Sequence, residues 1–215
     1  MKSIIKKAAV TAGVGAAALV FATPASATPF PAATWTVTPA SPSPLPVKGI
    51  NTGNVVLTAG SIQLTCTAAT ATGTIASTTG NPGQLGTITT STWGPTCTSP
   101  LGPVSVVHVG GWKLWGSTYD PAVGSGTTAG YLNTITANVT AGACKFTVIG
   151  KASGKYTNST GALAVNSLAG ELSVAASPAP VGCGAVITTA TKPTFKGTYL
   201  VKVTNTTTIP KIVGS

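Results

Sequence analysis

Short runs in which apolar and polar residues alternate recur along this chain, and they constrain its fold more than any other feature. In the clearest run, Phe195–Val203, the odd-numbered residues Phe195, Gly197, Tyr199, Val201 and Val203 share one face. A period of two is that of a half-buried β-strand, and turns rich in glycine and proline separate the runs. We therefore predict an all-β fold, a single-domain antiparallel β-sandwich or barrel of roughly ten short strands, stabilised by two disulfides.

Composition favours the same fold class. Threonine, glycine, alanine, serine and valine dominate, and charged residues make up only 7% of the chain. Few strong helix formers are left to cover exposed helix faces, whereas β-branched residues suit strands.

Residues 1–27 have the pattern of an export signal. Three lysines lie within the first seven residues, an apolar run extends from Ala8 to Ala22, and Ala25-Ser26-Ala27 offers a small-residue cleavage site. The apolar run is shorter than the roughly 20 residues that span a membrane. We expect cleavage after Ala27 and a secreted, extracellular protein with access to the cell wall and no membrane anchor after cleavage.

The rest of the chain predicts one domain with two irregular segments. Cleavage leaves 188 of the 215 residues, a natural size for one core. We assign residues 28–209 to a single all-β domain, with a linker rich in proline and serine at 39–48. Residues 210–215 are expected to form a flexible C-terminal tail.

All four cysteines lie after the signal, and an even count in an exported chain indicates disulfides. Of the three possible connectivities we favour Cys66–Cys97 and Cys144–Cys183, because each pair then closes one strand-turn-strand module. Each bond stabilises the fold by roughly 3–4 kcal/mol. The spacings match no zinc site, so we expect no metal and no cofactor.

Groups that carry out catalysis are scarce. Asp120 and Glu171 are the only carboxylates of the sequence, and both are predicted to be solvated turn residues. The single histidine, His108, has no Gly-x-Ser-x-Gly elbow to serve, and the thiols are expected to be oxidised. We expect a protein that is not an enzyme and has no catalytic residues.

The chain after residue 27 contains nine lysines and two acidic residues, which gives a net charge of about +7. Arginine is absent, so phosphate and guanine cannot be read by bidentate contacts, and we expect no specific nucleic-acid binding. The lysines are spread along the chain. They either keep an otherwise uncharged surface soluble or attract anionic wall polymers or polysaccharide.

The segment from 104 to 119 is the best candidate for a ligand-binding site. It combines a strand-forming run, a Gly-Gly turn or bulge and the candidate residues His108, Trp112, Lys113, Trp115 and Tyr119. Aromatic faces beside polar groups suit a stacking platform for sugars. On one strand, however, Trp112 and Trp115 point to opposite faces, so core packing of at least one tryptophan is the alternative.

Several motifs resemble those of a group of exported Thr/Gly/Ser-rich proteins of actinobacteria with four cysteines. The shared motifs are Ala33-Thr-Trp-Thr-Val-Thr-Pro39, Leu64-Thr-Cys66-Thr, Gly154-Lys-Tyr-Thr-Asn-Ser-Thr-Gly161, Gly182-Cys183 and Phe195-Lys-Gly-Thr-Tyr199. The resemblance implies an extracellular location and an all-β fold, but no activity and no functional residue. His108, Trp112 and Trp115 lie outside the shared pattern.

Two functions remain after these exclusions, and neither fixes the oligomeric state. The first is a structural or interaction module, without enzyme activity, in or near the cell envelope. The alternative is a glycan- or small-ligand-binding module that uses residues 108–119.

Overall fold

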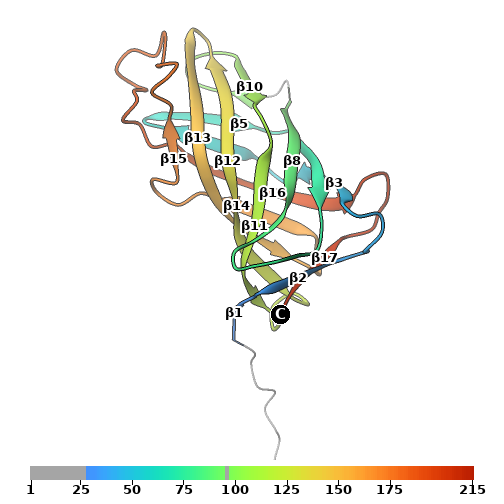
Figure 1. Cartoon of the computed structure of the whole chain (residues 1–215). Helices are drawn as coiled ribbons and strands as arrows, with labels where there is room; N and C mark the ends of the chain where they lie inside the picture. The colour runs from blue at the N-terminus through green and yellow to red at the C-terminus, as the bar shows by residue number, and fades with distance from the viewer. Residues whose placement is uncertain (1–27, 95–96) are drawn as a thin grey trace, which may run out of the picture.

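The computed structural model describes residues 28–94 and 97–215, and its main feature is an antiparallel sheet that closes into a barrel (Figure 1). Following the ring, the eight barrel strands are β14 (Ala162–Asn166), β13 (Cys144–Thr157), β12 (Thr127–Ala141), β11 (Trp112–Asp120), β8 (Gly83–Trp93), β6 (Ala69–Ile75), β3 (Leu45–Asn51) and β16 (Thr194–Val203). Pairing of β16 with β14 closes the ring. The predicted antiparallel sandwich or barrel is confirmed as a barrel.

Further strands extend the barrel wall at both ends. At one end β16 also pairs with β4 (Val55–Ala59), and β5 (Ile62–Cys66) and β9 (Cys97–Thr98) follow β4 in the sheet. At the same end β15 (Leu172–Val174) pairs with β13, and β10 (Val104–His108) pairs with β12. At the other end β1 (Phe30–Pro31) pairs with β11, and β17 (Lys211–Gly214), β2 (Thr34–Thr38) and β7 (Thr78–Thr79) form a small second sheet. No helix of the described residues has the length and apolarity to cross a membrane.

The Gly-Gly at 110–111 interrupts a strand line and does not form a hairpin. β10 and β11 both run antiparallel to β12, with His108 opposite Ala137 and Lys113 opposite Asn133. Gly110 has a φ of +70°, a conformation that glycine adopts without strain. The bulge lets one wall of the barrel bend between its two halves.

Both disulfides form as predicted and lie at the end of the barrel that carries β4, β5 and β9. Cys66–Cys97 joins β5 to β9, and Cys144–Cys183 joins the start of β13 to the loop before β16. All four residues are buried. Cys66–Cys97 fixes β9, a strand of only two residues, and Cys144–Cys183 fixes the loop before β16 to β13.

Trp35 of β2 closes the opposite end. Its side chain is 0% exposed, and its Nε1–H donates to the carbonyl of Gly80 (3.1 Å). Gly83 and Gly116 allow this close approach, since a Cβ atom on either would lie within 3.0 Å of the indole ring. Figure 1 shows β2 and β17 crossing beneath the lower end of the barrel.

Two expected irregular segments are partly strand. The linker predicted at 39–48 ends earlier, because β3 begins at Leu45, which is 1% exposed. Pro46 is tolerated there because it lies past the last β3–β16 pair, Val47–Val203, where no ladder bond needs its missing N–H. The export signal expected at residues 1–27 lies outside the described residues.

The prediction that residues 210–215 form a flexible C-terminal tail is wrong. Residues 211–214 form β17, paired with β2, and Ile212 is 3% exposed. The buried amide of Asn158 bonds both the N–H (2.8 Å) and the carbonyl (2.9 Å) of Ile212. This segment is too short to show a strand period by itself, and its partners lie far away in the sequence.

Replacing the closing tryptophan should weaken the whole fold. Trp35→Ala removes a fully buried ring, so we expect a loss of about 3–5 kcal/mol in the free energy of unfolding. Denaturant unfolding followed by circular dichroism measures it. Val213→Ala on β17, at a side chain 40% exposed, is the control and should change that free energy by less than about 0.5 kcal/mol. Equal losses in both variants would contradict the closing role of Trp35.

Candidate functional site

An aromatic pair occupies the outer wall of the barrel where β11, β12 and β13 lie side by side. The register places Trp115 opposite Tyr131 and Tyr131 opposite Ser153, so the three side chains share one face of the wall. The adjacent residues Leu132 and Ala152 belong to the core, so the shared face is the outer one. The rings of Trp115 and Tyr131 are nearly parallel, at 15°, with centroids 6.3 Å apart. The ammonium of Lys151 lies 5.5 Å from the centroid of the Tyr131 ring, within cation–π range.

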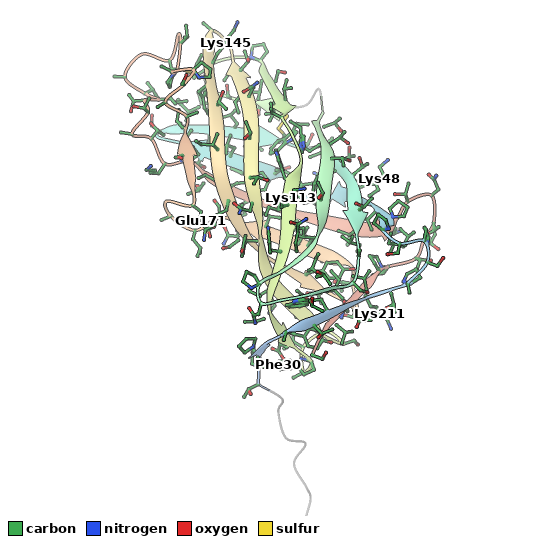
Figure 2. All side chains as sticks on the ribbon, in the orientation of Figure 1. Phe30, Lys48, Lys113, Lys145, Glu171 and Lys211 are labelled. Carbon is green, nitrogen blue, oxygen red and sulfur yellow. A yellow bond between two sulfur atoms is a disulfide. The ribbon has the colours of Figure 1, made fainter. Side chains whose placement is uncertain are left out.

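Lysine side chains flank this pair on both sides. The half-buried Lys113 donates from Nζ to Thr87 Oγ1 (3.2 Å) along the same wall. Figure 2 shows Lys113 over the middle of the barrel wall and Glu171 towards its left edge. Within the described residues the Trp115 Nε1 atom is buried and has no hydrogen-bond partner, so the half-buried ring presents its carbon atoms to the outside. We call Lys113, Trp115, Tyr131 and Lys151 the outer-wall patch.

Glu171 anchors one edge of the outer-wall patch. Its side chain is 8% exposed; Oε2 accepts from the backbone N–H groups of Ser153 and Leu168 (2.8 Å each), and Oε1 accepts from Ser153 Oγ (2.6 Å). Lys151 Nζ lies 3.9 Å from the same carboxylate. Burial alone would raise the pKa of Glu171, but these hydrogen bonds and the Lys151 charge outweigh it and hold the pKa below the ordinary value. The predicted solvated turn residue is therefore wrong for Glu171.

Asp120 fits its prediction as a turn residue. It ends β11, and its Oδ1 accepts from the backbone N–H of Ala122 (3.0 Å). The hydrogen bonds of Asp120 and of Glu171 have no residue in common, so the two side chains do not form a pair of neighbouring carboxylates.

Trp112 belongs to the interior, and His108 lies half-buried beside it. Trp112 is 7% exposed and donates from Nε1 to the carbonyl of Thr136 (3.2 Å). His108 stacks on Trp112 with centroids 4.2 Å apart, and its Nε2–H donates to the carbonyl of Gly110 (2.6 Å). The prediction that Trp112 and Trp115 point to opposite faces is confirmed.

The fifth predicted residue, Tyr119, lies at the closed end of the barrel. It is 6% exposed and packs edge-on against Phe30 at 6.0 Å between centroids. The predicted site thus separates into three places. Lys113 and Trp115 lie on the outer wall, Trp112 lies in the interior with the half-buried His108 stacked on it, and Tyr119 lies at the end that Trp35 closes.

Sequence analysis missed Tyr131, Lys151 and Glu171 as members of the same surface. Tyr131 begins an alternating run in the sequence, which marks it as a strand residue but does not name its neighbours. The register of β11, β12 and β13 brings it beside Trp115. Among the described residues, no group of three or more histidine, cysteine or acidic side chains gathers where it could hold a metal ion.

The protein is an all-β barrel with two disulfides, an architecture consistent with an extracellular protein. Comparisons of the chain with known protein families, curated proteins and solved structures gave no match.

The anchoring of Glu171 predicts an acid-dependent loss of stability. Because folding lowers its pKa, this carboxylate stabilises the native state fully above its ordinary pKa of 4.5, and the contribution disappears as pH falls through the lowered folded-state value. Glu171→Gln should lose about 1–2 kcal/mol at neutral pH, through weaker hydrogen bonds, and should show a flatter acid limb.

Chemical unfolding of both proteins between pH 7 and pH 2 measures this difference. Asp120→Asn is the matched control, because that carboxylate accepts one hydrogen bond in an exposed turn, and we expect little change. A Glu171→Gln variant with the wild-type pH profile would contradict the anchoring role.

Proposed function

We propose that this protein is an exported binding module of the cell envelope, without enzyme activity, which holds anionic wall polymers or polysaccharide on its outer-wall patch. The observation that carries the proposal is the near-parallel Trp115–Tyr131 pair with Lys151 over the Tyr131 ring. It supports the glycan-binding alternative of the sequence more strongly than a purely structural role.

The geometry suits a sugar chain in two ways. Aromatic rings fixed on adjacent strands offer a flat apolar surface without a large loss of side-chain entropy on binding. Lysines at 113 and 151 supply positive charge on either side of that surface. The excess of lysine over acidic residues favours anionic chains, whose carboxylate or phosphate groups a lysine contacts as a point charge.

Rigid support distinguishes this patch from scattered surface aromatics. Tyr131 lies on the long β12–β13 hairpin, and Lys151 is held near the ring by the anchored carboxylate of Glu171. A preorganised surface loses less conformational entropy when a ligand binds. These contacts hold rings and charges in place and involve no nucleophile or general acid, which supports a binding role.

Removing the aromatic pair tests the proposal directly. Trp115→Ala with Tyr131→Ala should reduce retention of the oxidised protein on washed cell walls and insoluble polysaccharide at least tenfold, because the apolar surface is lost. Val107→Ala, at a side chain 54% exposed on β10, is the control. Equal retention of the double variant and the wild type would contradict the proposal.

A salt series separates the charged from the aromatic contribution. Lys113→Ala with Lys151→Ala should flatten the dependence of retention on salt, since screened lysine contacts weaken as ionic strength rises. The matched control is Lys48→Ala with Lys202→Ala, a pair of lysines opposite each other on β3 and β16 across the barrel. If both pairs change the salt dependence alike, the charge acts through the whole surface and the outer-wall patch is not the site.

A further inference from the structure

The interior of the barrel contains a cavity of about 120 Å³. It lies between the core under β4 and β5 and the end that Trp35 closes, and all eight barrel strands contribute to its wall. Apolar side chains dominate the lining, which includes Leu57, Ala71, Val148, Ala152, Val165 and Leu172. No charged side chain of the described residues lines the cavity.

Several polar groups around the cavity have partners within the protein, whereas the buried Nε1 of Trp115, another lining residue, has none in the described residues. Trp112 donates to the carbonyl of Thr136, Tyr156 donates its hydroxyl to the carbonyl of Pro210, and Thr128 donates to the carbonyl of Ile212. Burial raises the pKa of the Tyr156 hydroxyl, so it stays an uncharged donor. A charged ligand would find no opposite charge in this lining, so its burial is costly.

We propose that this cavity is a binding site for a small, uncharged, apolar molecule about the size of a single hydrocarbon ring. An apolar protein cavity of about 150 Å³ is known to stay dry and to bind benzene. The cavity in this barrel is slightly smaller and similarly lined. Trp115 and Tyr131 also contribute to the cavity lining, whereas the patch lysines Lys113 and Lys151 do not, so the cavity takes a second, uncharged class of ligand.

A seam in the barrel wall gives access to this cavity. β8 pairs with β11 only as far as Ile88 and β10 pairs only with β12, so in the described residues the end of β8 and β10 share no backbone ladder. One side-chain hydrogen bond crosses the gap, from Ser91 Oγ–H on β8 to His108 Nδ1 on β10 (3.1 Å), and Trp93 Nε1–H on β8 donates to the same Ser91 Oγ (3.1 Å). Ser91 and Trp93 also line the cavity, so opening these contacts exposes it.

Titration of the full mature protein with toluene, followed through its methyl resonances, tests the proposal. We expect saturable shifts of Leu57, Val148, Val165 and Leu172, with no shift of the exposed Val181. Benzoate, which has a similar shape but carries a charge, should bind at least tenfold more weakly because no charged side chain of the described residues lines the cavity. Absence of saturable shifts in the wild type, or equal binding of benzoate, would overturn the proposal.

Filling the cavity provides an independent variant. Ala152→Leu should weaken toluene binding at least tenfold, and Ala71→Leu, from the opposite side of the ring, should do the same if the first variant does not fold. Lys113→Ala with Lys151→Ala on the outer wall should bind toluene like the wild type, which keeps this test distinct from that of the proposed function. Undiminished binding in a folded, cavity-filled variant would overturn the site.

The access route has its own readout. Ser91→Ala breaks the contact between β8 and β10, so we expect toluene to exchange several-fold faster. Thr92→Ala is the control on the same strand, since its hydroxyl bonds Thr70 (2.6 Å) on the outside of the barrel. An unchanged exchange rate in Ser91→Ala would overturn the seam as the route.

Discussion

Closure of the sheet through β14 is the constraint on which the rest of the structure depends. All five residues of β14 pair with β16, and four of them also pair with β13, so this short strand joins the two sides of the ring. Its Val165 points into the core and is 3% exposed. Without it, β13 and β16 would present open edges, which attract other strands. The curved outer wall and the enclosed interior both follow from this closure.

A closed ring of eight strands leaves an interior just wide enough for side chains or one small ligand. Here small residues such as Gly49, Ala71 and Ala152 face inward, and they leave space that larger side chains would fill. A cavity of this size costs on the order of 3 kcal/mol, at about 24 cal/mol per Å³. Each disulfide contributes roughly 3–4 kcal/mol, so the covalent bonds offset what the unfilled interior costs.

The outer wall illustrates how one carboxylate organises a surface of lysines. Glu171 is one of only two acidic residues, and its contacts with Ser153, Leu168 and Lys151 join the loop before β15 to β13. Because Lys151 lies between this carboxylate and the Tyr131 ring, its charge stays beside the aromatic pair. The same lysine on an unanchored surface would spread its charge over many rotamers, with a corresponding loss of side-chain entropy on binding.

The sequence by itself determined the all-β class and the opposite orientation of Trp112 and Trp115, because strand period is a local property, and among three connectivities it favoured the disulfide pairing that the structure shows. Only the tertiary structure decided that the sheet closes, that Trp115 meets Tyr131, that Glu171 is anchored and that residues 211–214 form a strand. Each of these depends on which distant strands pair and in which register. Alternation states which residues share a face, but it does not choose the neighbour across the strand, and that choice belongs to the closed barrel as a whole.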